Sequence, residues 1–298
     1  MTKQLVINVA QHETRVALLE DGTIVEMFVN RQDDFDITGN IYKGVVQRVL
    51  PGMQAAFVNI GTTQAAFIYV NDVIEEGKDE FETLFDEISP KENLQENLDQ
   101  PSPETTDGAF GETRLGIEDL LIEGQQILVH VSKSPIGTKG ARVTTNVSLP
   151  GRYLVLMPTS DHIGVSRKIE DEEERGRLKG LVEKLRPANM GYIVRTASEG
   201  IGQDVLTSEM EFLSKLWNKI QKRYKSAPSP SILHKELDVS LRAVRDLLTH
   251  EAGKVVIDSA DGYDAIINFL DTFMPELKNS MELYQGAENI FDAYNLEG

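Results

Sequence analysis

Short apolar runs separated by tight polar turns fill the first 70 residues of the chain. The first three runs cover residues 5–10, 14–19 and 23–29, and the turns between them read Gln-His-Glu and Glu-Asp-Gly. Runs of this length joined by such turns predict strands that pair with their neighbours in sequence. We therefore expect the chain to begin with an antiparallel meander.

A second set of short apolar runs has glycine-containing turns, Pro51-Gly52 and Gly61-Thr62-Thr63 among them. Many short strands with such turns are typical of a small closed barrel. We expect a barrel built from five runs, which lie at residues 41–50, 55–60, 65–70, 126–132 and 141–149.

The segment that interrupts this predicted barrel is strongly acidic. Residues 71–120 hold 16 Asp and Glu against three Lys and Arg, a net charge of −13 out of −18 for the whole chain. The remainder carries only −5, so binding to a polyanion stays open for it. The composition of the segment predicts a solvated loop with a helical turn near 81–88.

From residue 151 the chain mixes strands and helices, which predicts a separate α/β unit that ends at a Pro- and Ser-rich linker, 225–231. The β and α elements expected after this linker are too few to form a sheet alone. We expect them to complete the amino-terminal meander as a mixed sheet built from both ends of the chain. The predicted class is α+β with several domains. The expected elements are strands at 153–157, 191–196, 254–258 and near Leu283, and helices at 171–185, 204–224, 237–249 and 263–273.

Several classes of site are disfavoured by composition. The chain has no cysteine, which removes disulfides and thiolate chemistry and suits a reducing compartment. It has no apolar run of about 20 residues and no signal-peptide pattern, so we expect a cytoplasmic protein without a membrane partner. Glycine loops of the nucleotide-binding kind are absent and the five histidines lack metal-ligand spacing. We expect no nucleotide cofactor.

Two aromatic residues, Phe57 and Phe67, fall on consecutive strands of the predicted barrel, with the cations Lys43 and Arg48 close in sequence. Aromatic rings flanked by cations are how an OB-type barrel holds single-stranded nucleic acid. The alternative is that both rings fill the barrel core, the commoner fate of Phe. A later turn, Lys139-Gly-Ala-Arg142, would extend the same basic rim, and the alternative is an ordinary solvated turn.

Polar residues after two other predicted strands offer further candidates. Arg195 and Thr196 provide a donor fork and a hydroxyl that fit a phosphate, and the alternative is a surface salt bridge. Asp258 and Asp261 follow a strand and offer carboxylates for a metal site, but a turn and a helix cap also explain them.

Seven motifs, in order and spacing, resemble the ribonuclease E/G family across the chain except for the acidic segment. They are Asn40-Ile-Tyr-Lys-Gly, Gln54-Ala-Ala-Phe-Val-Asn-Ile-Gly, Gly137-Thr-Lys-Gly-Ala-Arg-Val-Thr-Thr, Tyr153-Leu-Val-Leu-Met-Pro, Gly164-Val-Ser-Arg-Lys-Ile-Glu, Val194-Arg-Thr-Ala and Asn289-Ile-Phe-Asp-Ala-Tyr. The resemblance implies an RNase H-like domain split between 1–37 and 229–298, an S1 domain of the OB type over 38–147 with the acidic insertion at about 71–120, and an α/β 5′-sensor domain over 148–228.

The resemblance also implies roles for single residues. The S1 domain of the family clamps single-stranded RNA, and Phe57, Phe67 and Lys139 match its contact positions, which favours an exposed place over the core for both rings. The sensor domain recognises an RNA 5′-monophosphate. Gly151, Val155, Arg195 and Thr196 match its pocket, and Arg167 and Lys168 match basic positions of the same domain.

The chain departs from the family in its chemistry. Members cleave RNA with a DNase I-like domain whose aspartates hold Mg²⁺, and they associate through a Cys-Pro-x-Cys zinc link. Neither is found here, and Asn8 stands where an RNase H enzyme would carry an aspartate. The resemblance thus implies Mg²⁺ for the family but no catalytic residue, metal ligand or zinc link in this chain. Self-association stays open.

We therefore expect the RNA-binding, 5′-monophosphate-sensing portion of an Mg²⁺-dependent endoribonuclease specific for single strands, which acts in ribosomal RNA maturation and messenger decay. One alternative is a non-catalytic RNA-binding module that regulates or assembles a partner nuclease. A second places catalysis at Asp258 or Asp261. The acidic segment, finally, could mimic RNA and occupy the binding groove.

Overall fold

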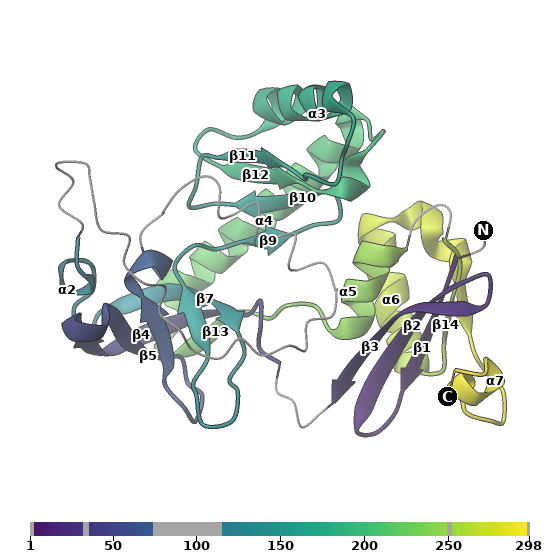
Figure 1. The fold of residues 1–298 in the computed structure, drawn as a ribbon, viewed down its shortest axis with the longest axis horizontal. Helices are drawn as coiled ribbons and strands as arrows, with labels where there is room; N and C mark the ends of the chain where they lie inside the picture. Colours follow the sequence, from purple (N-terminus) through teal and green to yellow (C-terminus); the bar gives the residue numbers. More distant parts are fainter. Residues whose placement is uncertain (1–2, 32–35, 74–114, 249–251, 297–298) are drawn as a thin grey trace.

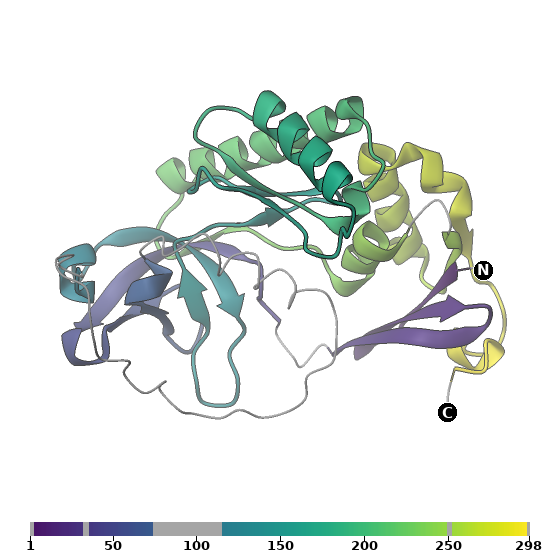
Figure 2. The same ribbon diagram turned by 45° about the horizontal axis from the view of Figure 1, so that its top comes forward.

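The computed structural model describes residues 3–31, 36–73, 115–248 and 252–296. These residues form three β-sheets and the helices that pack against them (Figure 1). The barrel lies at one end of the molecule, the five-stranded sheet with both chain termini at the other, and the four-stranded sheet between and above them (Figure 2). The α+β class expected from the sequence is confirmed.

The five-stranded sheet joins the two ends of the chain. Its strand order is β15-β14-β1-β2-β3, in which β1, β2 and β3 form the expected antiparallel meander and β14 and β15 add on in parallel. Helices α5 and α6 bury one face of this sheet and α7 covers part of the other. The elements are β1 (Lys3–Val9), β2 (Glu13–Glu20), β3 (Thr23–Arg31), α5 (Val239–Leu247), β14 (Ala252–Ile257), α6 (Ala260–Phe273), the 3-10 helix η4 (Pro275–Ser280), β15 (Met281–Leu283) and α7 (Ile290–Ala293).

The second sheet is a barrel of five strands. It is closed by β4, which pairs with β7 through its first half and with β5 through its second half. Alternate residues point inward and make a core of aliphatic side chains. Its elements are β4 (Ile41–Leu50), η1 (Pro51–Met53), β5 (Ala55–Asn59), β6 (Ala66–Tyr69), η2 (Val70–Asp72), α2 (Ile117–Leu120), β7 (Gln126–Lys133) and β8 (Arg142–Thr144).

The acidic insertion is described only at its two ends. Residues 74–114, with the helical turn expected near 81–88, lie outside the described residues. At its carboxyl end the structure has the short helix α2, which the sequence analysis placed in a loop. Ile117 of α2 is fully buried in the barrel core, so burial of one apolar side chain fixes this turn.

The four-stranded sheet has the order β11-β12-β10-β9 and packs against helices α3 and α4 around a core that includes Trp217. The single strand expected at 141–149 is divided: β8 belongs to the barrel and β9 to this sheet. Apolar alternation continues through the division, so periodicity alone could not locate it. The elements are β9 (Leu149–Pro150), β10 (Leu154–Met157), β11 (Ile163–Val165), α3 (Glu172–Leu185), β12 (Gly191–Val194), η3 (Thr196–Ser198) and α4 (Gln203–Ser226).

One further strand, β13 (Ser231–His234), begins where a linker was expected and pairs antiparallel with β4 of the barrel. Ile41 of β4 and Leu233 of β13 also reach the core of the four-stranded sheet. The barrel and the α/β unit are therefore in direct contact. Within the described part of the chain, no helix has the length and apolar character that crossing a membrane requires.

Candidate nucleic-acid interface

A row of four side chains crosses the outer face of the barrel. Arg48 on β4 lies opposite Phe57 on β5, Phe57 lies opposite Phe67 on β6, and Phe67 pairs with Arg142 on β8. Cross-strand partners point to the same side of a sheet, so two rings lie between two cations. Phe57 is 39% exposed and Phe67 half-buried. Phe57 therefore lies on the surface rather than in the core, which was the alternative for both rings.

Tyr69 extends this row, and the sequence analysis missed it. It follows Phe67 by two positions on β6, and the two rings meet edge to face with centroids 5.5 Å apart. The guanidinium of Arg142 lies 5.3 Å from the centre of the Tyr69 ring. The period of two along a strand was the signal that could have found it.

The turn that carries Lys139 lies against the start of β6. Gly140 allows this approach, because a Cβ at that position would lie 1.9 Å from the carbonyl oxygen of Ala65. A hydrogen bond of 3.2 Å from Gln64 Nε2 to the carbonyl of Gly137 ties the same turn to β6. The exposed Lys139 is thereby held near the aromatic row.

Lys43 lies elsewhere, although it was expected beside the rings. It is only 7% exposed, and its Nζ donates to the carbonyl oxygens of Tyr224 and Ala227 at 2.9 and 3.0 Å. These carbonyls end α4, where a cation is favoured by the helix dipole. Lys43 thus ties the barrel to α4, and its ammonium is not presented to the outer face.

A second cluster forms around Arg195, at the end of β12. Its Nη1 donates to the carbonyl oxygen of Gly151 and to Asp246 Oδ1, both at 2.6 Å. The structure therefore brings Arg195 and Gly151 together, as the resemblance implied. It also contains the ion pair that was the alternative, since Asp246 of α5 is the partner. The Arg195 side chain is about one quarter exposed.

The loop beside Arg195 is held by a half-buried carboxylate. Glu209 of α4 accepts hydrogen bonds from three consecutive backbone N–H groups, those of Arg152, Tyr153 and Leu154, at 2.7, 2.9 and 2.7 Å. Burial raises the pKa of Glu209, and the three backbone donors oppose that shift. Gly151 lies over the carboxylate, and a Cβ there would come within 2.7 Å of it. Sequence spacing gives no sign of this contact.

Hydroxyl and basic side chains surround the exposed Thr196. Its Oγ1 is 3.0 Å from the hydroxyl of Ser166, which follows β11. The next two residues, Arg167 and Lys168, are both exposed. Val155 is different: it is 1% exposed and pairs through the backbone with Pro150 and Ile193, so it contributes to the sheet beneath the cluster.

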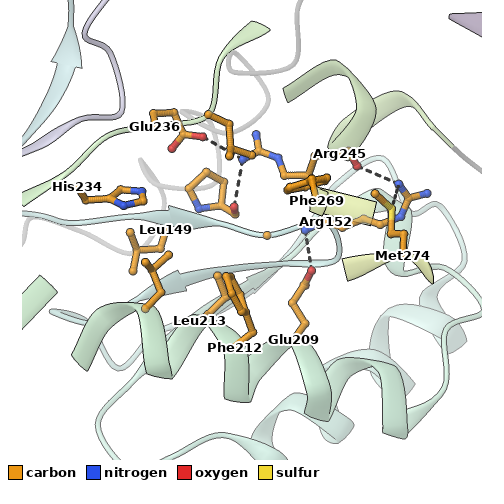
Figure 3. A pocket seen from close by; sticks show the side chains of 14 residues that line it. Leu149, Arg152, Glu209, Phe212, Leu213, His234, Glu236, Arg245, Phe269 and Met274 are labelled. Carbon is orange, nitrogen blue, oxygen red and sulfur yellow. Dashed lines mark hydrogen bonds and ion pairs between the residues drawn. The ribbon is translucent and has the colours of Figure 1, made fainter. Parts of the chain in front are cut away.

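Beneath Arg195, charged side chains join the four-stranded sheet to α5. Arg245 is 7% exposed and contacts both Asp246 and Glu236. The guanidinium of Arg245 holds the pKa of Asp246 below its usual value, against the effect of burial. Arg245 and Glu236 border an apolar cavity of about 140 Å³ between α4 and α5, which Phe212 and Met274 also line (Figure 3).

The carboxyl ends of β1 and β14 do not form a metal site. Asp258 accepts hydrogen bonds from Asn8 Nδ2 at 2.6 Å and from the backbone N–H of Val9 at 2.8 Å, while Arg15 contacts the Asn8 oxygen. Nowhere in the described ranges do three acidic or histidine side chains gather closely enough to hold a cation. These residues therefore do not fit Mg²⁺.

Comparison with known proteins adds to this picture. The model of the "Ribonuclease E/G family" matches residues 148–298. "Ribonuclease G" of Haemophilus influenzae is 42% identical over 294 residues, which are 99% of this chain and 55% of that protein. "Ribonuclease G" of Escherichia coli K12 is 38% identical over 299 residues, 100% of this chain and 56% of that protein.

A third relative, "Ribonuclease E" of a Nostoc species, is 35% identical over 274 residues, 92% of this chain and 35% of that protein. The chain thus spans about half the length of the ribonuclease G relatives it matches. With a family model matched over residues 148–298 and these relatives aligned over nearly its whole length, the chain belongs to the ribonuclease E/G family.

Proposed function

We propose that this chain is the RNA-binding and 5′-end-sensing portion of a ribonuclease G-like endoribonuclease. The barrel is its S1 domain and holds single-stranded RNA on the outer face through Phe57, Phe67 and Lys139. The four-stranded sheet and its helices form the 5′ sensor, and the five-stranded sheet is the split RNase H-like domain. The parent reaction is Mg²⁺-dependent hydrolysis of single-stranded RNA in ribosomal RNA maturation and messenger decay.

The row Arg48–Phe57–Phe67–Arg142 is the observation that carries this proposal. Rings side by side on the outer face of a barrel, here the exposed Phe57 and the half-buried Phe67, supply stacking surfaces for successive bases. Each such surface is worth about 1 to 3 kcal/mol. Arg48 is exposed and supplies donors and positive charge for phosphates, whereas two donors of Arg142 are bonded to Asp72.

The cluster around Arg195 supports the sensing role. Asp246 and the carbonyl of Gly151 fix the guanidinium plane, and Thr196 and Ser166 add hydroxyl donors beside it. Arg167 and Lys168 add positive charge at the same edge. A planar donor fork beside neutral donors is suited to a terminal phosphate.

Binding of two labelled RNAs that differ only at the 5′ end tests both parts. The full chain should bind a 5′-monophosphorylated single strand more tightly than its 5′-hydroxyl counterpart. Phe57→Ala should weaken the binding of both RNAs by roughly tenfold, because one stacking surface is lost. Arg195→Ala should abolish the preference for the phosphate and leave 5′-hydroxyl RNA almost unaffected.

Lys215→Ala is the matched control for charge. Lys215 lies on α4 with its side chain 78% exposed, so the substitution removes one positive charge at a position that belongs to neither site. It should preserve the 5′ preference. Retained preference in Arg195→Ala would contradict the sensor assignment, and unchanged affinity in Phe57→Ala would contradict the barrel face.

Cleavage is tested separately by incubating the purified chain with 5′-monophosphorylated RNA and Mg²⁺, with EDTA as the control. The proposal expects intact RNA. EDTA-sensitive cleavage that survives Asp258→Asn and Asp261→Asn would reveal a metal site outside the described residues, and cleavage that these variants abolish would place catalysis in the five-stranded sheet.

A further inference from the structure

The surface around Tyr69 has the features of a stacking position. Tyr69 is 39% exposed, the same fraction as Phe57. It lies on the same face of β6 as Phe67, and the edge-to-face contact between their rings holds its plane. The residue opposite Tyr69 on β5 is Ala55, so β5 places no large side chain beside the ring.

Arg142 and Asp72 preorganise this position. Arg142 Nε and Nη2 donate to the two oxygens of Asp72 at 3.0 and 3.1 Å. Asp72 Oδ2 also accepts from the backbone N–H of Tyr69 at 3.3 Å. With Arg142 held 5.3 Å from the centre of the ring, little side-chain entropy remains to be lost when a base stacks against Tyr69.

The charges around Tyr69 suit an RNA backbone. Asp72 and Arg142 form one ion pair, and its cationic partner is the more exposed, with 37% of the Arg142 side chain exposed against 14% of the Asp72 side chain. A cation beside the ring favours a phosphate on the neighbouring nucleotide.

We propose that Tyr69 is a third RNA-stacking position, so that the barrel face holds three successive bases on Phe57, Phe67 and Tyr69. This inference rests on the proposed function, because it assumes that a single strand lies along this face. It extends the site by one nucleotide toward Arg142.

The test measures binding of 5′-hydroxyl oligouridines of increasing length, labelled at the 3′ end, so that the sensor does not contribute. Tyr69→Ala should bind the longer oligomers roughly tenfold more weakly than wild type. In wild type, affinity should rise when the oligomer becomes long enough for one more base to reach Tyr69, and this rise should be absent in Tyr69→Ala. Tyr69→Phe should bind within about twofold of wild type, because the ring does the stacking. Met27→Ala, at an exposed apolar position on β3, should bind like wild type.

The outcomes separate the two proposals. If Phe57→Ala and Phe67→Ala bind weakly and Tyr69→Ala binds like wild type at every length, the third position is overturned and the proposed function stands. If all three variants bind like wild type, the proposed function itself fails. An equal loss at every length in Tyr69→Ala, with a lower unfolding midpoint, would assign Tyr69 a structural role and overturn the inference.

Discussion

Acidification should destabilise this protein through one buried imidazole. His130 on β7 is 9% exposed, and its Nε2 has no hydrogen-bond partner among the described residues. Burial lowers the pKa of His130 from 6.5 to about 4, and the nearby His234 acts in the same direction. His130 is therefore harder to protonate in the folded protein than in the unfolded chain.

The magnitude follows from these two pKa values. Above pH 6.5 the imidazole is neutral in both states, and the free energy of unfolding carries no contribution from its protonation. As the pH falls through 6.5, only the unfolded chain takes up the proton, so stability falls until the folded pKa is reached near 4. At pH 5 the loss is about 2 kcal/mol, because one pKa unit corresponds to about 1.4 kcal/mol.

Urea unfolding of wild type and His130→Asn at pH 7.5 and pH 5 measures this loss. The single tryptophan, Trp217, is buried on α4 and reports on unfolding by fluorescence, with circular dichroism as a second probe. The asparagine removes the titrating group, and groups other than its neighbour His234 titrate alike in both proteins. Between pH 7.5 and 5 the wild type should lose about 2 kcal/mol more than the variant. Equal losses would refute the assignment to His130.

Three further substitutions test contacts that position the two sites, each by the free energy of unfolding in urea. Gly140→Ala should cost about 2 kcal/mol or more, because its Cβ would overlap a backbone carbonyl of the barrel; an unchanged midpoint would contradict that close approach. Lys43→Met should cost about 2 kcal/mol, because two carbonyls at the end of α4 lose their donor, and full stability would show that water replaces it. Asp246→Asn should cost about 3 kcal/mol, since Arg245 and Arg195 keep their charges without this partner; a stabilised variant would contradict the argument.

Local patterns were enough to predict much of the fold. The meander, the barrel strands and the long helices follow from apolar periodicity and turn residues, which act between neighbours in sequence. The side on which Phe57 lies could not be read from periodicity, since an inward and an outward ring have the same spacing. Phe57 matches an RNA-contact position of the resembled family, which favoured a place on the surface, and Phe57 is exposed in the structure.

The contacts that sequence analysis missed are those between distant segments. Lys43 was grouped with the aromatic rings because it is near them in sequence, yet its partners are more than 180 residues away. Glu209 and the backbone donors of residues 152–154 are likewise joined only by the fold. No local pattern predicts such pairs, because the distance between the two partners depends on how the whole intervening chain folds.

The pairing of β13 with β4 has a consequence for how this chain can be divided. β4 lies between β7 and β13 over its first half, so a fragment cut out at 38–147 would leave backbone donors and acceptors of β4 open to solvent. Open strand edges recruit other chains. The strand that protects this part of β4 therefore comes from a segment outside 38–147. An excised barrel would tend to aggregate unless residues 231–234 were supplied with it.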